Sequence, residues 1–193
     1  LTNIKDQAIT GNVKDALRLN CVGVGFTIYP GSEYNYKLIE QACNLFREAK
    51  EAGLITVLWS YARGSMSKKG ETAINIISYA AHMACLCGAH IIKVKLPASY
   101  LEDDPTKDVF IKNNIKIDTA VDRVKVIKRS CFNGRRIVVF SGGEAKDDDE
   151  LLNEVRAIKE GGGNGSIVGR NCFQRSKKEA LALLEQMFSI YKN

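Results

Sequence analysis

The feature that most constrains the fold is a repeat of short apolar runs separated by helical patterns. The runs are rich in β-branched residues and nearly continuous in hydrophobicity, which is typical of parallel strands buried on both faces. They cover residues 22–29, 55–61, 90–96, 136–140 and 165–168. Between them, apolar residues recur at three- and four-residue spacing, which indicates amphipathic helices. Strand and helix therefore alternate along the chain, and the sequence predicts a parallel α/β sheet.

Helix signals agree with this repeat. Gly53 ends the first predicted helix, and Ser176 with Glu179 forms a capping box for the last one. Acidic residues 147–150 stand where a helix N-terminus favours negative charge. The glycine-rich run 161–165 follows a helix, so we interpret it as a helix stop and a turn rather than as a dinucleotide-binding loop. The predicted helices cover residues 34–52, 72–87, 118–132, 147–160 and 177–191.

The spacing of the strands limits the possible architectures. Their ends fall near residues 29, 61, 95, 140 and 168, about 28 to 45 residues apart. A (β/α)8 barrel allots about 31 residues to each unit. Only five units are present, so spacing alone leaves two folds open: part of a barrel, or an open doubly wound sheet.

Composition and charge exclude several classes of function. Hydrophobic residues make up 45% and charged residues 26% of the 193-residue chain, which is typical of a globular protein. Because no apolar run approaches about 20 residues and no leader pattern opens the chain, we expect neither a membrane partner nor secretion. The net charge of +6 is spread along the sequence. We therefore expect a small anionic ligand and no nucleic acid, with a basic nucleic-acid binder as the alternative to be tested by salt-dependent retention on DNA.

The six cysteines favour neither disulfides nor a metal site. One cluster holds His82, Cys85, Cys87 and His90. On a helix, Cys85 and Cys87 lie about 200° apart, so they cannot both face one ion. We expect buried free thiols in a reducing, cytoplasmic protein, with no metal.

Two lysines on the third predicted strand are the sharpest candidates for chemistry. Lys93 and Lys95 are two residues apart, so both side chains point to one face. On an inward face, burial and a like-charged neighbour both favour the neutral amine, which can form a Schiff base with a carbonyl substrate. Alternatively, both extend into solvent from an edge strand. Spacing does not decide which lysine attacks.

Other polar side chains follow the carboxyl ends of the strands, where α/β folds bind ligands. Tyr61 shares a face with Trp59 and is a candidate general acid or base beside cations that lower its pKa; alternatively it plugs a barrel rim. The turns Ser141-Gly142-Gly143 and Gly169-Arg170 follow the last two strands. Glycine N–H groups with an arginine suit a phosphate dianion, and barrels often bind phosphate at this position.

Five motifs together resemble one known family. They are GVGFTIYPGSEY, TVLWSYARG, GAHIIKVKLP, VVFSGGE and GSIVGRNCFQR, in this order from about Gly11 to the C-terminus. They closely resemble the archaeal-type class I fructose-bisphosphate aldolases (the DhnA-like family). The resemblance implies a TIM (β/α)8 barrel that uses no cofactor. It also implies reversible cleavage of fructose 1,6-bisphosphate, a phosphorylated sugar of glycolysis and gluconeogenesis, to dihydroxyacetone phosphate and glyceraldehyde 3-phosphate.

The resemblance also implies roles for individual residues. It places the Schiff-base lysine at Lys93 and the general acid/base at Tyr61, with Trp59 lining the site. The family's phosphate-binding turns fall on Ser141, Gly142 and Gly143 and on Gly169 and Arg170. Our own inference adds Lys95, as a charge neighbour or as a ligand of the second phosphate together with Arg63.

Compared with that family, the chain is expected to begin inside the helix before the fourth strand. Residues 1–193 would then form a single partial barrel, equivalent to the last five of eight strands, without a catalytic Asp that the family carries earlier. The other strands would lie on another polypeptide, be replaced by self-association, or be absent. Family members are often oligomers, so a homo-oligomer is expected. The alternatives are a related keto-phosphate aldolase, transaldolase-like or thiolase-like barrel enzyme, and a catalytically dead remnant or scaffold subunit.

Overall fold

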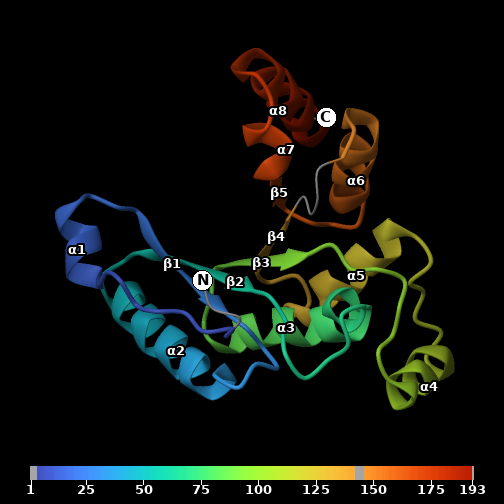
Figure 1. Ribbon diagram of the computed structural model, residues 1–193, viewed down its shortest axis with the longest axis horizontal. Coiled ribbons are helices and arrows are strands. Elements are labelled where there is room, and N and C mark those ends of the chain that lie inside the picture. The colour runs from blue at the N-terminus through green and yellow to red at the C-terminus, as the bar shows by residue number, and fades with distance from the viewer. Residues whose placement is uncertain (1–3, 142–145, 193) are drawn as a thin grey trace.

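A computed structural model describes residues 4–141 and 146–192 and contains one sheet of five parallel strands. The strands follow one another in chain order across the sheet (Figure 1). They are β1 (Gly23–Ile28), β2 (Ile55–Ser60), β3 (Ile91–Lys95), β4 (Ile137–Ser141) and β5 (Gly165–Ile167). All five predicted strands are confirmed, each within one residue at either end. The expectation of an edge strand for the two lysines is wrong, because β3 is the central strand.

The five predicted helices are also confirmed, with one corrected boundary. The segment predicted as a helix over 72–87 begins with a 3₁₀ turn, η1 (Gly70–Thr72), and its α-helix begins only at Ile74. Three short helices, α1, α4 and α7, were not predicted. The α-helices are α1 (Val13–Arg18), α2 (Asn35–Glu51), α3 (Ile74–Leu86), α4 (Asp104–Lys112), α5 (Ala120–Ser130), α6 (Asp148–Glu160), α7 (Arg170–Phe173) and α8 (Lys177–Lys192).

The helix signals act as predicted. The Ser176 hydroxyl donates to the Glu179 carboxylate at 2.7 Å, and the Glu179 N–H donates back to Ser176 at 3.3 Å. Asp147 caps α6 by accepting from the Glu150 N–H at 2.8 Å. Gly53 adopts a φ of +74° directly after α2, a conformation that glycine reaches without strain. The run 161–165 ends α6 and leads into β5.

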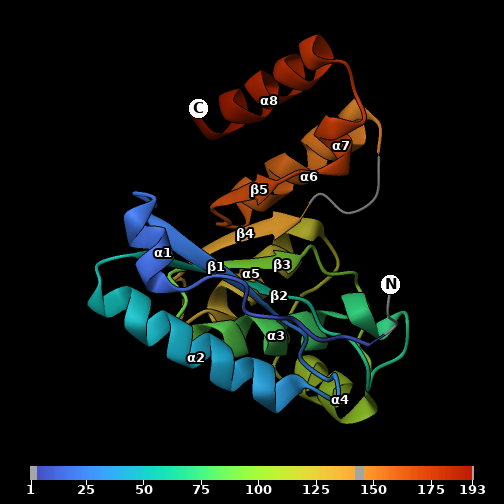
Figure 2. The same ribbon diagram turned by 60° about the vertical axis from the view of Figure 1, so that its left-hand side comes forward.

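The two faces of the sheet have different environments. Even-numbered strand residues such as Leu58, Ile92 and Phe140 are fully buried. They pack against α2, α3 and α5, which lie along one face of the sheet (Figure 2). The odd-numbered residues of β2, β3 and β4 are half-buried or exposed. The sheet is therefore covered on one face and open on the other, and the lysines lie on the open face.

Isoleucines are exposed on the open face at the amino ends of β2 and β4 and at the carboxyl end of β5. Ile55, Ile137 and Ile167 on this face are each more than 40% exposed. In the described part of the chain, β1 and β5 are the two edges of the sheet and do not pair with each other. The five units thus form an open, parallel α/β sheet equivalent to part of a barrel.

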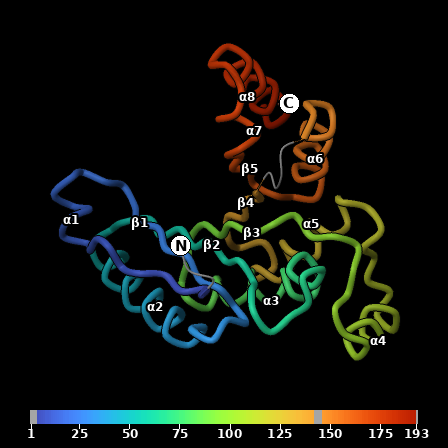
Figure 3. Tube along the Cα trace, viewed as in Figure 1, coloured from blue at the N-terminus to red at the C-terminus, as the bar shows by residue number. Residues whose placement is uncertain are grey.

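A second, smaller core lies beyond β5. There α6, α7 and α8 pack around Leu151, Val155, Leu183 and Met187, and they lie apart from α2 and α3, whereas α6 also contacts α5 (Figure 3). The buried Asn171 of α7 links this helix to the segment directly before α6, because its side chain accepts from the Lys146 N–H at 2.8 Å. Among the described residues, no helix combines the length and the apolar character needed to cross a membrane.

Candidate active site

The pairing of β3 with its neighbours determines what each lysine faces. Lys93 lies opposite Trp59 of β2 on one side and Val139 of β4 on the other. Lys95 lies opposite Ser141, at the last residue of β4. Both lysines are on the open face, as the two-residue spacing predicts. Lys93 is therefore deeper in the sheet, and Lys95 is at its carboxyl rim.

The Lys93 amine lies beside the indole ring of Trp59. Its Nζ is 6.0 Å from the ring centroid, at the outer limit of a cation–π contact. The ring lies over Gly25 of β1, where an added Cβ would come within 2.5 Å of Cζ3. Burial lowers the pKa of Lys93 below its ordinary value. Within residues 4–141 and 146–192, no carboxylate forms an ion pair with this amine. Lys93 is therefore the lysine better suited to react as a neutral amine.

Lys95 has a different environment. Its Nζ lies 3.4 Å from a carboxylate oxygen of Glu71, and Arg63 contacts the same oxygen at 3.0 Å. Burial and the charge of Arg63 lower the pKa of Lys95, while Glu71 partly offsets them. The prediction that each lysine lowers the pKa of the other is wrong for Lys93, because burial alone accounts for its shift.

Tyr61 follows β2, and its phenol faces the Ser141 side chain. Burial raises its pKa above 10, and the charge of Arg63 and the Ser141 side chain offset this only in part. The cation Arg63 thus lowers the pKa of Tyr61 as predicted, but burial has the larger effect and the net shift is upward. At neutral pH the phenol keeps its proton, which suits a general acid.

A cationic pocket of about 560 Å³ lies at the carboxyl rim of β3 and β4. Four predicted ligands, namely Arg63, Lys95, Ser141 and Arg170, line it together. Lys93, Trp59 and Tyr61 are not among its lining residues. The structure thus brings the predicted anion ligands together beside, rather than around, the predicted nucleophile.

The predicted glycine turns are only partly described. Gly142 and Gly143 lie outside the described residues. Gly169 is the N-cap of α7, and a Cβ there would meet nothing within 4 Å, so space does not require glycine. Arg170 is the first residue of α7, whereas the sequence predicted no helix between the last strand and residue 177.

Three charged residues near the pocket were missed by sequence reasoning. Arg123 donates to the carbonyls of Pro97, Ile117 and Asp118 and so fixes the loop after β3. Lys146 pairs with Glu150 and Glu154 of α6. Glu71 lies in η1, directly before the segment predicted as a helix over 72–87. Its only sequence signal is an acidic residue shortly after the carboxyl end of a strand.

Most of the cysteines are buried, and both histidine rings contact polar groups of neighbouring elements. Cys85, Cys87, Cys131 and Cys172 are buried free thiols, as predicted, whereas Cys21 is exposed. The His90 ring contacts Thr56, and the His82 ring contacts the Ser130 carbonyl. Among the described residues, no three His, Cys, Asp or Glu side chains gather as metal ligands would.

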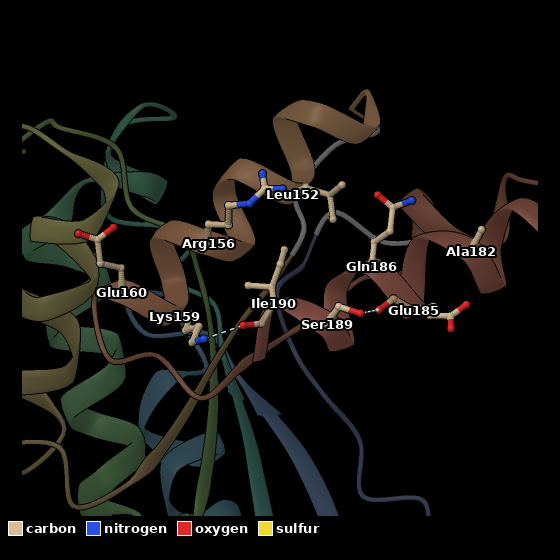
Figure 4. A pocket seen from close by; sticks show the side chains of 9 residues that line it. All are labelled: Leu152, Arg156, Lys159, Glu160, Ala182, Glu185, Gln186, Ser189 and Ile190. Carbon is tan, nitrogen blue, oxygen red and sulfur yellow. Dashed lines mark hydrogen bonds between the residues drawn. The ribbon is translucent and has the colours of Figure 1, made fainter. Parts of the chain in front are cut away.

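A larger groove of about 980 Å³ lies between α6 and α8 (Figure 4). Its charges are mixed, with Arg156 and Lys159 close to Glu160 and Glu185. Lys159 is already bonded, since its Nζ donates to the Ile190 carbonyl at 2.7 Å. No candidate nucleophile of this groove lies next to a group of charges of the same sign. The rim of β3 and β4 is therefore the better candidate site.

Comparison with known proteins gives consistent matches. A model of the DeoC/LacD family of aldolases matches residues 1–175. The fructose-bisphosphate aldolase/6-deoxy-5-ketofructose 1-phosphate synthase of Methanocaldococcus jannaschii is 30% identical over 191 residues, 98% of this chain and 54% of that protein. The class 1 fructose-bisphosphate aldolase of Thermoproteus tenax is 33% identical over 180 residues, 92% of this chain and 59% of that protein. The chain thus spans little more than half the length of these relatives.

Solved structures give the same match. An archaeal fructose-1,6-bisphosphate aldolase, with its catalytic lysine covalently bound to the carbinolamine intermediate, superposes with a TM-score of 0.77 at 29% identity. That match covers 97% of this chain and 66% of the solved chain. A second archaeal fructose 1,6-bisphosphate aldolase gives a TM-score of 0.74 at 32% identity, over 98% of this chain and 67% of that one.

Proposed function

Because this chain belongs to the DeoC/LacD family of aldolases, we propose that it acts as a class I fructose-bisphosphate aldolase. The reaction is the reversible cleavage of fructose 1,6-bisphosphate to dihydroxyacetone phosphate and glyceraldehyde 3-phosphate. The observation that carries the proposal is the position of Lys93, a half-buried amine on the central strand beside a cationic pocket. The names of its relatives support the substrate.

In the proposed mechanism, Lys93 is the nucleophile. Its neutral amine attacks the C2 ketone of the substrate and forms a carbinolamine, which loses water to give an iminium ion. The iminium then accepts the electron pair released when the C3–C4 bond breaks. Tyr61 donates its phenol proton to the hydroxyl that leaves the carbinolamine as water, and the resulting phenolate accepts the C4 hydroxyl proton when the C3–C4 bond breaks. Trp59 holds the substrate against the open face. The iminium is itself the electron sink, so this cleavage has no step that requires a metal.

The cationic pocket binds phosphate in this proposal. Arg63 and Lys95 lie at its β3 side, and Ser141 and Arg170 at its β4 and β5 side. Charged hydrogen-bond donors of this kind are the usual ligands of phosphate oxygens. Gly142, Gly143 and Gly169 would add backbone N–H groups.

The proposal extends to the organisation of the protein. Residues 1–193 form one partial barrel whose strands are equivalent to the last five of eight. A homo-oligomer in the cytoplasm, working in glycolysis and gluconeogenesis, fits this family and the buried free thiols. The coverage of 54–59% of the curated relatives supports a partial barrel.

A related keto-phosphate aldolase or transaldolase-like enzyme is the second candidate. The specific support is the additional name of the M. jannaschii relative, a 6-deoxy-5-ketofructose 1-phosphate synthase. Both candidates use the same lysine, so a panel of keto-phosphates distinguishes them. A catalytically dead remnant remains the third candidate, and it predicts no turnover of any of these substrates.

The direct test is an assay of fructose 1,6-bisphosphate cleavage, with Lys93→Met as the matched control. We expect triose phosphates to appear with the unmodified chain, in the presence of a chelator, and not with the variant. Triose phosphate release that persists in Lys93→Met would contradict the assignment of the nucleophile. No release by the unmodified chain from any keto-phosphate would favour the remnant.

A further inference from the structure

Glu71 joins two cations of the candidate site through a single oxygen atom. Its side chain is 12% exposed. One carboxylate oxygen lies 3.0 Å from Arg63 and 3.4 Å from Lys95, and Lys68 lies 3.2 Å from both carboxylate oxygens. Lys68 is 89% exposed, so solvent screens its charge and leaves its side chain free to move away from Glu71. The contacts with Arg63 and Lys95 are the enclosed ones.

The surrounding loop holds Glu71 in place. The Ser67 N–H and hydroxyl donate to Glu102 at 2.7 and 2.9 Å, and the Gly70 N–H donates to the Ser67 hydroxyl at 2.9 Å. A Cβ on Gly70 would lie about 2.5 Å from the Glu102 carboxylate, so the loop and that carboxylate are closely packed. The Ala98 N–H then bonds the Thr72 carbonyl at 2.8 Å, which joins the loop to the segment after β3. Glu71 is therefore fixed against the strand that carries both lysines.

A shared oxygen restricts both cations. Arg63 and Lys95 carry like charges and would repel each other in a half-buried site. Because both contact the same oxygen of Glu71, they stay next to each other at the pocket rim. Lys93, two residues earlier on the same face, has no such partner among the described residues. The two lysines thus differ in their neighbours and not in their strand or their face.

We propose that Glu71 is a positioning residue that holds Lys95 and Arg63 together as charged phosphate ligands and so leaves Lys93 as the single attacking lysine. This inference rests on the proposed function. Glu71 touches neither the reacting carbonyl nor Lys93 and acts through its two cationic partners. The pairing with Glu71 also explains how two lysines on the same face of one strand can have different roles.

The effects on protonation agree with this arrangement. Burial would raise the pKa of Glu71, but the hydrogen bond from Lys68 and the charges of Arg63 and Lys95 outweigh it, so the carboxylate is ionised at neutral pH. Its charge raises the pKa of Lys95 against the effect of burial. The pKa of Lys93 is lowered by burial with no such compensation.

The test compares Glu71→Gln with Glu71→Asp and with Glu102→Gln. Glu102→Gln weakens the same loop without touching Arg63 or Lys95. Each protein is treated with dihydroxyacetone phosphate and borohydride over a range of ligand concentration and pH. Peptide mapping by mass spectrometry then locates the adduct, and circular dichroism checks the fold.

We expect Glu71→Gln to raise the half-saturating ligand concentration about tenfold, since the phosphate ligands lose their alignment. We also expect part of its adduct to move from Lys93 to Lys95. Glu71→Asp should restore labelling of Lys93, and Glu102→Gln, which keeps Glu71 itself, should raise the half-saturating concentration less than Glu71→Gln does and should leave the adduct on Lys93. An unchanged concentration and labelling site in Glu71→Gln, or an equal effect of Glu102→Gln, would overturn the inference. No adduct in the unmodified chain would instead refute the proposed function.

Discussion

At the scale of single residues, the site depends on how two neighbouring lysines differ. Lys93 lies against an indole ring without a carboxylate partner among the described residues, and Lys95 is paired with Glu71. A strand places both on one face, but their partners come from β2 and from the loop before α3. The chemistry of each amine is therefore set by residues distant in sequence.

Replacing Tyr61 with Phe should separate its chemical role from its packing role. The variant keeps the half-buried ring and loses only the hydroxyl. If the phenol transfers protons, kcat should fall by about 10²- to 10⁴-fold with little change in KM. Because its pKa is raised, the pH profile of the unmodified chain should show no loss of the phenol proton below pH 10. An unchanged kcat would assign Tyr61 to packing alone.

Replacing Lys93 with Met should increase stability while removing the nucleophile. Burial lowers the pKa of Lys93, so the folded state holds its proton less tightly than the unfolded chain. Below the lowered pKa the buried charge disfavours folding, and stability rises with pH between that pKa and 10.5. At pH 7, Lys93→Met should therefore increase the free energy of unfolding, by about 0.5 kcal/mol at most because solvent screens the charge of a half-exposed amine.

Urea denaturation measures this change, with Lys95→Met as the control. Lys95→Met leaves Glu71 without one of its cations and should lower the free energy of unfolding. A decrease for Lys93→Met would show that the contact with Trp59 outweighs the cost of burying the amine.

At the scale of the elements, the pairing of β1 with β2 places the indole ring next to the amine. Gly25 has no side chain, and the ring of Trp59 occupies that space. Gly25→Val should displace the ring and lower the rate of adduct formation on Lys93 about tenfold. Trp59 is the only tryptophan in the chain, so its fluorescence should shift in parallel.

Gly11→Val is the matched control, because a Cβ at Gly11 meets nothing within 4 Å. It should change neither the fluorescence nor the rate. A Gly25→Val protein with a shifted spectrum and an unchanged rate would show that Trp59 does not contribute to the site.

Most of the elements could be predicted from the sequence, for a physical reason. Strands buried among helices give continuous apolar runs, and β1 to β5 were found from these runs alone. The short helix α4 has no buried residue, so it leaves no apolar pattern to find. Glu71 was missed because its role depends on a loop packed against Glu102, thirty-one residues later. The pKa of Tyr61 was misjudged because burial outweighs charge there, and a sequence does not show burial.

At the scale of the whole molecule, the open apolar face requires a cover. Ile55, Ile137 and Ile167 expose more than 40% of their surface on it, and both sheet edges are unpaired in the described part. Such faces and edges favour association. If copies of the chain cover each other, the melting temperature should rise with protein concentration. A cooperative, concentration-independent transition with a monomer mass would contradict self-association.

The central claim is that Lys93 is the amine that forms the Schiff base. Borohydride reduction with dihydroxyacetone phosphate, followed by peptide mapping, tests it most directly. The predicted result is one covalent adduct per chain, on Lys93. Lys93→Met should abolish this adduct. Lys95→Met should retain it but require a higher ligand concentration. An adduct on Lys95 in the unmodified chain, or no adduct on either lysine, would contradict the account.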